Sequence, residues 1–369
     1  MNIYIYDRHD WPKFRWNHER LDVRLAAVRY KQGRLIGRME EIGFSLRNQA
    51  TLHTLTLDVL KSSEIEGEIL DKEQVRSSIA RRLGVDIGAL TPASRNIEGV
   101  VEMMLDATQN YDKPLSRERL FGWHASLFPN GYSGMRKIKV AAWRDDAKGP
   151  MQVVSGPIGR EHVYFEAPPA DRLEKEMAAF FDWFNGDDGT DLVSRSCIAH
   201  LWFVTIHPFE DGNGRIARAI ADMTLARSEQ SAQRFYSMSA QIRQGRGKYY
   251  EGLEAAQKGT LDITERMEWF LDCLSRAFDD VEETLAVVLE KARFWKSCAA
   301  LPLNERQRLI LNKLLEGFKG KLTSSKWANL AKCSQDTALR DIQDLVERGI
   351  LAKDPAGGRS TSYSLVKRG

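Results

Sequence analysis

Apolar residues recur at the three- and four-residue spacing of an α-helix along almost the whole 369-residue chain, whereas strand-like alternation is rare. The exception lies between Ser133 and Pro169, where glycines and prolines separate two short β-prone runs at 151–154 and 162–165. Turn residues between two such runs predict a β-hairpin. We therefore expect a mainly α-helical protein that carries one small hairpin.

Length and pattern together suggest several domains. At about 150 residues per domain, the chain has room for two or three. We expect an N-terminal helical region at 1–90, a central core at 91–275, a connecting helix at 276–303 and a C-terminal domain at 304–369. The last region shows three short helical segments followed by two short strands, which is the order of a winged-helix domain.

The net charge of +3 is unevenly distributed. Residues 304–369 contain 13 basic and 7 acidic residues and so carry +6, whereas the preceding residues carry −3. No run approaches the roughly 20 apolar residues that a spanning helix needs, so we expect a cytoplasmic protein without a membrane partner. The four cysteines never occur as Cys-x-x-Cys, which argues against a zinc site or a disulfide framework.

A polar, glycine-rich loop follows an apolar helical segment that ends at Ile206, and the next helical segment begins at Arg215. The loop therefore lies at a helix N-terminus. Backbone N–H groups of residues 212–214 are predicted to bind an anion there, because the free donors and the positive end of the helix dipole both point outward. Phosphate is the anion that we expect to bind at such a site.

Side chains in the same stretch suit phosphoryl chemistry. Arg215 and Arg218 share one side of the first helical turn and can neutralise neighbouring phosphoryl groups. Asp211 offers an oxygen ligand for Mg²⁺, and His207 can accept a proton near neutral pH. Taken singly, each feature is more often structural: a turn, a hydrogen-bonded histidine or a solvated arginine. Their combination within twelve residues favours the functional interpretation.

This stretch resembles the signature of the Fic family, His-x-Phe-x-(Asp/Glu)-Gly-Asn-Gly-Arg-x-x-Arg. The matching residues are His207, Phe209, Asp211, Gly212, Asn213, Gly214, Arg215 and Arg218. Fic proteins have an all-helical core with a β-hairpin flap, and most transfer AMP from ATP to a Tyr, Thr or Ser hydroxyl of a target protein. The resemblance, which covers about 91–275, implies a protein adenylyltransferase that uses ATP and Mg²⁺.

The resemblance also implies a role for each signature residue. His207 would deprotonate the target hydroxyl, and Asp211 would bind Mg²⁺. The backbone of 212–214 would hold phosphate, while Arg215 and Arg218 would contact the outer phosphates. Phe209 would anchor the loop in the core, and Glu210 is assigned with its neighbours to ATP binding. The hairpin within 133–169 lies where the family places its flap, which aligns the target segment by strand addition.

A second match concerns regulation. Residues 62–67 fit the family's inhibitory pattern (Ser/Thr)-x-x-x-Glu-(Gly/Asn) through Ser62, Glu66 and Gly67, on a predicted helix around 55–67. The resemblance implies that Glu66 pairs with Arg218 and displaces the γ-phosphate of ATP. In the alternative, Glu66 is simply a solvated residue of a surface helix.

Tyr249 and Tyr250 resemble a tyrosine pair that follows the family's core motif and borders the nucleotide site. Aromatic packing in the core explains this pair equally well.

Two other functions compete with AMP transfer. A de-AMPylating hydrolase would use the same residues, with Glu66 orienting a water. A nucleotide-sensing DNA-binding regulator would use residues 304–369. The predicted third helix of that region, 335–348, has two arginines and four acidic residues, so its net charge of −2 disfavours contact with phosphates. We therefore favour a protein as the partner of this region, and the family's common dimerisation leaves a homodimer open.

Overall fold

The computed structural model describes residues 4–41, 44–155, 162–298, 301–315, 317–318, 320–355 and 361–366. The chain divides into two compact units. The first comprises Met1–Val85 with Thr91–Glu282, and the second comprises Asp86–Leu90 with Glu283–Gly369. The finer boundaries expected from the sequence stay a prediction. None of the helices in the described part of the chain has the length and apolar character that crossing a membrane would require.

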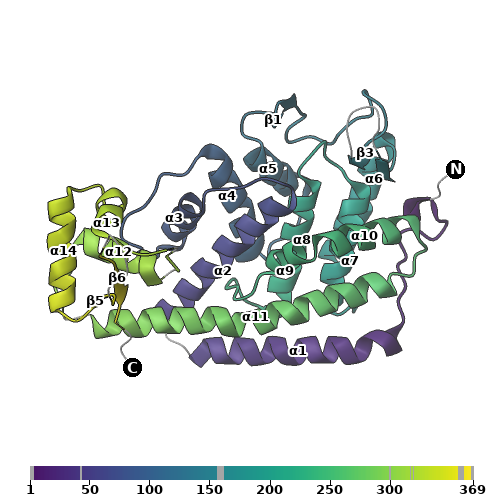
Figure 1. The fold of residues 1–369 in the computed structure, drawn as a ribbon. Helices are drawn as coiled ribbons and strands as arrows, with labels where there is room; N and C mark the ends of the chain where they lie inside the picture. The colour runs from purple at the N-terminus through teal and green to yellow at the C-terminus, as the bar shows by residue number, and fades with distance from the viewer. Residues whose placement is uncertain are drawn as a thin grey trace. The chain divides into compact units, whose positions relative to one another are not determined.

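The first unit is built almost entirely from helices (Figure 1). They are α1 (His18–Glu41), α2 (Phe44–Ile65), α3 (Lys72–Leu83), α4 (Arg95–Gln109), α5 (Arg117–Leu127), α6 (Leu173–Asn185), α7 (Leu192–Ile206), α8 (Asn213–Glu229), α9 (Met238–Gln244), α10 (Arg246–Lys258) and the part of α11 (Thr264–Ser297) up to Glu282, with short 3₁₀ turns η1 (Ile5–Asp7) and η2 (Ala170–Arg172). The mainly helical class expected from the sequence is confirmed.

Helices α7 and α8 form the centre of this unit and pack against each other (Figure 1). Every residue of α7 from Val193 to Ile206 is buried, including the polar residues Arg195 and His200. The helix begins at Asp191, whose carboxylate accepts hydrogen bonds from the N–H groups of Val193 and Ser194. The loop between α7 and α8 is thereby presented by two core helices.

Helix α2 is fixed to the same core by buried polar contacts. The Asp58 carboxylate is fully buried and accepts hydrogen bonds from the Ser237 hydroxyl at 2.6 Å and the Ser239 N–H at 3.3 Å. Those two serines lie at the start of α9, which packs along α2. One turn after Asp58, Ser62 is also buried. The position of the C-terminal end of α2 is therefore set by the core.

Helices α1 and α11 run parallel, side by side (Figure 1). Arg20 pairs with Glu268, Arg24 with Asp272 and Lys31 with Asp279. Each pair has the same separation of 248 residues along the chain, as parallel helices in register require.

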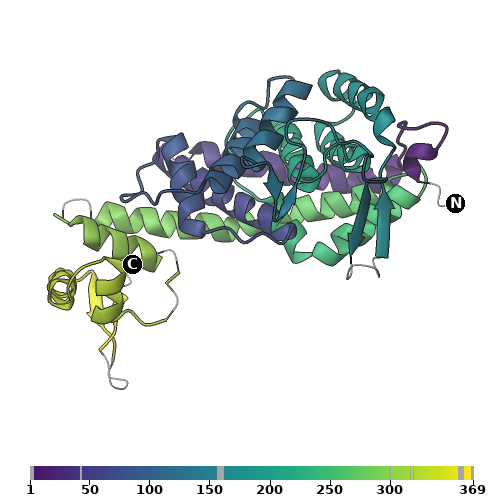
Figure 2. The same ribbon diagram turned by 90° about the horizontal axis from the view of Figure 1, so that it is seen from above.

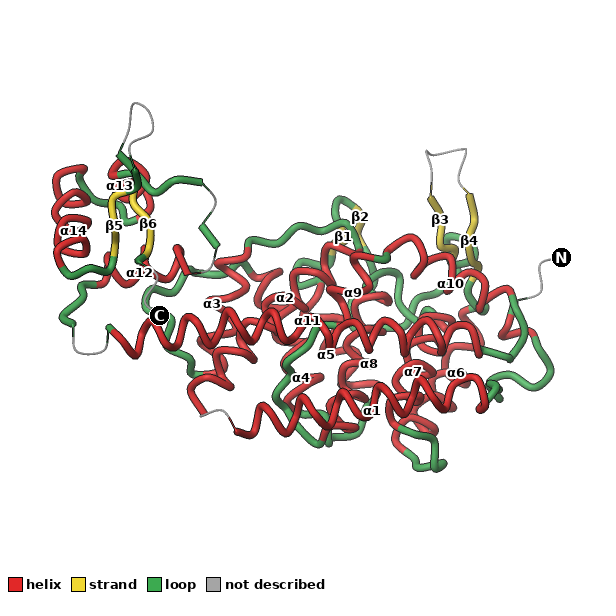
Figure 3. Tube along the Cα trace, turned by 60° about the horizontal axis from the view of Figure 1, so that its bottom comes forward, coloured by secondary structure: helices red, strands yellow, loops and turns green. Residues whose placement is uncertain are grey.

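The expected hairpin is present, and a smaller one precedes it (Figure 3). Strands β3 (Gln152–Ser155) and β4 (His162–Glu166) pair antiparallel, as Figure 2 also shows, with a register shift after Val153. The tip at 156–161 lies outside the described residues. Strands β1 (Tyr132–Ser133) and β2 (Arg136–Lys137) form a tight turn that the sequence analysis missed. We call the β3–β4 hairpin the flap.

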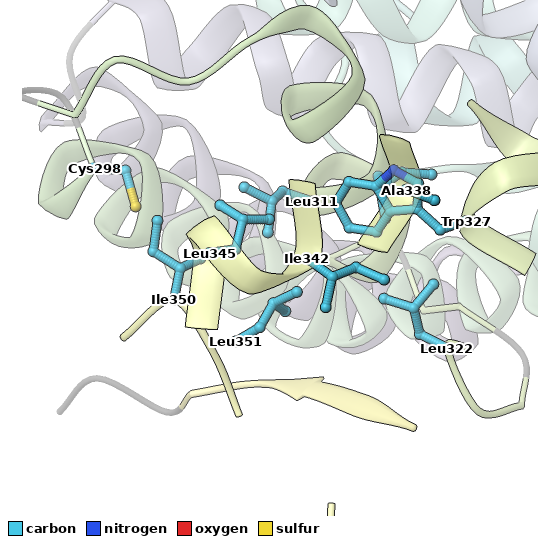
Figure 4. Close-up of a cluster of buried hydrophobic side chains, with 10 residues drawn as sticks. Cys298, Leu311, Leu322, Trp327, Ala338, Ile342, Leu345, Ile350 and Leu351 are labelled. Carbon is cyan, nitrogen blue, oxygen red and sulfur yellow. The ribbon is translucent and has the colours of Figure 1, made fainter. Parts of the chain in front are cut away.

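The second unit contains α12 (Glu305–Leu315), α13 (Ser324–Leu330), α14 (Gln335–Glu347), β5 (Leu351–Lys353) and β6 (Tyr363–Leu365). A bridge from Leu322 to Tyr363 adds a third short strand segment beside the antiparallel pair β5–β6. The helices and strands enclose a separate apolar core around Trp327 (Figure 4). This order of elements is the one expected for 304–369, and residues 356–360 of the expected wing lie outside the described residues.

Two acidic residues of α14 are paired within the second unit, and of these Asp341 is buried whereas the Asp344 side chain is 36% exposed. Asp341 is 6% exposed and binds Arg306 and Asn304. Asp344 accepts hydrogen bonds from Gln307 and Arg348. The sequence analysis counted both carboxylates in the net charge of −2 of this helix, and Arg306 of α12, which that count leaves out, pairs with Asp341.

Candidate active site

The polar loop joins α7 to α8 through two left-handed residues. His207 caps α7 with φ +52°, and its N–H donates to the Phe203 carbonyl at 3.0 Å. Gly212 precedes α8 with φ +80°, a conformation that glycine adopts without strain. Helix α8 begins at Asn213, two residues earlier than expected from the sequence.

Side-chain contacts within the loop keep it rigid. The amide of Asn213 donates to the Phe209 carbonyl at 2.8 Å and accepts from the Phe209 N–H at 3.0 Å. The Phe209 ring is fully buried and stacks on His124 with 4.2 Å between ring centroids. Phe209 therefore lies in the core, and the side chain of Asn213 braces the turn.

His124 supports the loop from α5. Its Nδ1 accepts from the Ala141 N–H at 3.1 Å, and its Nε2 lies 3.2 Å from the Asp211 carbonyl. A carbonyl only accepts, so Nε2 carries the proton and the ring is neutral. Burial is the main cause that lowers the pKa of His124 to about 4.

His207 is neutral and has one nitrogen available to act as a base. Its Nδ1 lies 3.1 Å from the Val204 carbonyl, so Nδ1 carries the proton and Nε2 retains its lone pair. Burial is the main cause that lowers the pKa of His207 to about 4, with Arg144 acting in the same direction. The imidazole is therefore unprotonated at neutral pH.

A cavity of about 730 Å³ opens beside the loop. Its walls are formed by the end of α2, the flap, the loop and α10. The residues predicted from the sequence that line it are Glu66, His207, Glu210, Asp211, Asn213, Gly214, Tyr249 and Tyr250. This volume is in the range of pockets that bind small molecules and cofactors. The other signature residues, Phe209, Gly212, Arg215 and Arg218, do not line it.

The Asp211 carboxylate is oriented by its neighbours. One oxygen accepts from the Gly212 N–H at 2.5 Å, and the other accepts from the Ser133 hydroxyl on β1. Arg136 on β2 donates to the Glu210 carbonyl at 3.3 Å. Among the described residues, no group of three or more His, Cys, Asp or Glu side chains is placed to hold a metal. A single carboxylate fits Mg²⁺ that also takes ligands from nucleotide phosphates and water.

Arg218 is held by the end of α2. Its Nη2 lies 2.7 Å from Oε1 of Glu66, and its Nε donates to the Ser62 hydroxyl at 2.9 Å. The Arg218 side chain is 2% exposed. Burial alone would lower the pKa of Arg218, but the Glu66 carboxylate and the Tyr249 hydroxyl outweigh it and the pKa is raised. The structure thus brings Ser62, Glu66 and Arg218 together.

Glu66 reaches this position because α2 ends at Ile65 and Gly67 turns the chain back. Gly67 has φ +86°, and the Glu68 N–H donates to the Ser63 carbonyl at 3.0 Å. A Cβ atom added to Gly214 would lie 2.2 Å from Oε1 of Glu66. The carboxylate therefore lies directly against the backbone at the start of α8.

A second carboxylate, which the sequence analysis missed, binds the other arginine. Oε2 of Glu68 lies 2.8 Å from Nη1 of Arg215, whose guanidinium also lies over the Phe128 ring at 5.2 Å. Both arginines of the loop are therefore paired with carboxylates from one turn. The sequence signal that could have predicted this second pair is the glutamate two positions after Glu66.

The two tyrosines occupy different environments. Tyr249 is 1% exposed, and its hydroxyl oxygen lies 3.1 Å from Nε2 of His200. Tyr250 is 36% exposed, and its hydroxyl donates to the Ile65 carbonyl at 3.4 Å. Both residues line the cavity, and Tyr250 also contacts the last residue of α2.

Two family models match the chain. Residues 114–225 match the Fic/DOC family, and residues 4–85 match a domain of unknown function, DUF4172.

Curated relatives match part of the chain. A protein adenylyltransferase Fic from Drosophila willistoni is 33% identical over 132 residues, covering 34% of this chain and 25% of the relative. A protein adenylyltransferase Fic from Drosophila mojavensis is 27% identical over 232 residues, covering 60% and 40%. The chain thus spans only a quarter to two fifths of the length of these relatives.

Solved structures match the fold over more of the chain. A Fic family protein from Desulfovibrio desulfuricans has a TM-score of 0.52 at 21% identity, covering 94% of this chain and 97% of that one. A Fic domain containing signaling protein from Bacteroides thetaiotaomicron has a TM-score of 0.52 at 18% identity, covering 73% and 97%. At these identities the likeness concerns the fold.

Proposed function

Because residues 114–225 form a Fic/DOC-family domain, we propose that the chain is a protein adenylyltransferase. It transfers AMP from ATP to a Tyr, Thr or Ser hydroxyl of a target protein. The observation that carries this proposal is the shared cavity, which is lined by His207, Asp211 and the first two residues of α8. Nε2 of His207 is the ring nitrogen that the Val204 carbonyl does not engage.

The chemical step needs a base and a stabilised leaving group. His207 accepts the proton of the target hydroxyl at Nε2, and the hydroxyl oxygen attacks the α-phosphorus of ATP. A new oxygen–phosphorus bond forms, the bond between the α-phosphorus and the bridging oxygen breaks, and pyrophosphate leaves. The N–H groups at the start of α8 bind phosphoryl oxygens and stabilise their charge.

Asp211 is the residue that would hold Mg²⁺, which supplies positive charge to the phosphate chain when bound. The Ser133 hydroxyl and the Gly212 N–H hold this carboxylate at the edge of the cavity. Arg215 and Arg218 would neutralise the outer phosphates once their ion pairs with Glu68 and Glu66 are broken.

We further propose that the form described here is autoinhibited by Glu66. The Glu66 carboxylate takes up the guanidinium of Arg218 and lies against Gly214, where a phosphate would otherwise bind. ATP must compete with this contact, or bind with its outer phosphates displaced.

Intact-mass measurement after incubation with ATP and Mg²⁺ tests the proposal. The Glu66→Gly variant should gain the mass of AMP, and the same variant with His207→Ala should not. Parallel incubations with GTP, CTP and UTP establish the donor. If Glu66→Gly adds no nucleotide to itself or to lysate proteins, the transferase assignment is wrong.

Hydrolytic removal of AMP is a second candidate, since the Glu66 carboxylate lines the same cavity as His207 and could orient a water. Incubating AMP-modified protein with wild type and with Glu66→Gln separates the two functions. Faster loss of AMP with wild type than with Glu66→Gln would support the hydrolase.

The proposed partner is a target protein with an accessible hydroxyl. We propose that residues 304–369 contribute to docking it, with DNA binding as the less favoured alternative. Deleting these residues should then lower modification of lysate proteins while leaving automodification of Glu66→Gly intact. Loss of tight, salt-sensitive DNA binding on the same deletion would favour the regulator instead.

A further inference from the structure

Arg144 lies between the flap and the loop, and its side chain is 1% exposed. Its Nε donates to the His207 carbonyl at 2.8 Å, and its backbone N–H donates to the Pro208 carbonyl at 2.9 Å. Arg144 thus binds the carbonyls of two consecutive residues, His207 and Pro208, at the point where α7 ends and the loop begins.

The other nitrogens of the guanidinium bind the base of the flap. Nη2 donates to the Pro168 carbonyl at 2.5 Å, and Pro168 follows the end of β4 by two residues. Nη1 lies 2.9 Å from the Asp146 carboxylate, which also accepts from the Ala170 N–H at 2.7 Å. Arg144 therefore connects the exit of the flap directly to His207.

His207 needs such a contact because its backbone is in the left-handed region, with φ +52°. For a residue with a Cβ atom this conformation is strained, and it persists only where surrounding contacts hold it. The bond from Arg144 fixes the His207 carbonyl, while Nδ1 is fixed at Val204. Together the two bonds fix the backbone and the ring of His207, which lines the cavity.

The charge of Arg144 also acts on the imidazole. The charged groups that influence His207 are Arg144, Asp211 and Glu66. The guanidinium disfavours a second positive charge, whereas the two carboxylates favour it. Arg144 is thus the group among these three that keeps His207 in its neutral, basic form.

We propose that Arg144 is a positioning residue that fixes His207 in its left-handed conformation and ties it to the base of the flap. The position of His207 relative to the flap strand that would align a target segment is then fixed. This inference rests on the proposed function, in which His207 receives the proton of the target hydroxyl.

The test compares Arg144→Met with Arg195→Met, both in the Glu66→Gly background. Arg195 is a matched control because it is 4% exposed and binds the Asp188 carboxylate and the Gly186 and Trp183 carbonyls. We expect Arg144→Met to lower kcat about 10²-fold with little change in KM for ATP, because the base is misplaced. Arg144→Lys should recover part of kcat. Equal losses in Arg144→Met and Arg195→Met would overturn the proposal.

A second readout does not depend on transfer. Titration of the His207 ring by NMR, assigned with His207→Asn, should show a higher pKa in Arg144→Met and an unchanged pKa in Arg195→Met. The acid limb of the pH–rate profile should move to higher pH in the same way. An unmoved His207 pKa in both Arg144→Met and a folded Arg144→Gln would overturn the proposal. Absence of transfer in the Glu66→Gly background refutes the proposed function instead, and the titration still decides the role of Arg144.

Discussion

Oε1 of Glu66 lies 2.7 Å from Nη2 of Arg218, although the two residues are far apart in the sequence: Glu66 directly follows α2, whereas Arg218 lies in α8. The arginine is 2% exposed and the glutamate 31%, so the pair is buried on one side and reaches the cavity on the other. An ion pair in this position neutralises the arginine in the absence of nucleotide. It also places a negative charge where the phosphates of ATP would need a positive one.

Replacing Glu66 should therefore activate the protein. We expect Glu66→Gly to raise the rate of automodification by roughly 5- to 150-fold, the usual range for coupling between an inhibitory contact and a ligand site. The control is Glu64→Gly, which makes a comparable backbone change but removes the pairs with Lys61 and Arg243. Rates are followed by intact mass with ATP and Mg²⁺, and equal rates in the two variants would contradict the inhibitory role.

Glu68 should act in the same sense but more weakly. The Glu68 side chain is 37% exposed, so solvent and salt screen its attraction to Arg215. We expect Glu68→Gln to tighten ATP binding by a few-fold at low salt, and less at high salt. Isothermal titration calorimetry in a His207→Ala background measures binding without turnover, with Glu19→Gln on α1 as the control. Unchanged affinity at both salt concentrations would remove Glu68 from the inhibitory contact.

The lowered pKa of His207, about 4, predicts how transfer depends on pH. The base must be neutral, and a group with this pKa stays neutral throughout the range in which an ordinary histidine becomes charged, about pH 5–8. Transfer by Glu66→Gly should therefore show no loss from base protonation until the pH approaches 4. Rate measurements across this range check the prediction, with the exposed His18→Ala as a control that keeps the same profile. A decline centred near the ordinary histidine pKa would contradict it.

Acid should destabilise the fold through His124. Its pKa is lowered to about 4 in the folded state from 6.5, so the unfolded chain binds a proton more readily between these values. Stability contributed by this residue is then present above pH 6.5 and is lost as the pH falls toward 4, in total a few kcal/mol.

The measurement is urea unfolding at several pH values, comparing wild type with His124→Gln. The variant should be less stable at pH 7, and the difference should shrink on acidification. Asp222, whose pKa is raised to about 7 mainly by burial, acts in the opposite direction, so the difference between the two proteins is the informative quantity. A difference that is independent of pH would show that His124 does not titrate as described.

The loop and its flanking helices could be predicted in outline because the decisive residues are neighbours in the sequence. The start of α8 was placed two residues late, since the side chain of Asn213 caps the turn through the backbone of Phe209. The flap followed from its turn residues. Arg144 and Ser133 could not be predicted, because their contacts with His207 and Asp211 join segments more than 60 residues apart.

Which side of α14 is covered could not be predicted from the sequence either, for the same reason. Its sequence gives the spacing of Asp341 and Asp344, but which side of the helix is covered depends on α12, from which Arg306 and Gln307 bind these carboxylates. The pairing of Glu66 with Arg218 came from the family resemblance. The short pattern at 62–67 alone favours a solvated Glu66.

The two family matches, 4–85 and 114–225, fall within a single compact unit. The segment 4–85 contains Glu66 and Glu68, which pair with Arg218 and Arg215. It also contains Asp58, whose carboxylate accepts a hydrogen bond from Ser237 at the start of α9. Losing the first segment would therefore remove the residue proposed to inhibit and expose the apolar interior at the same time. If Glu66 acts as proposed, truncation would relieve the inhibition only at the cost of the fold, whereas a point substitution would relieve it and leave the core intact.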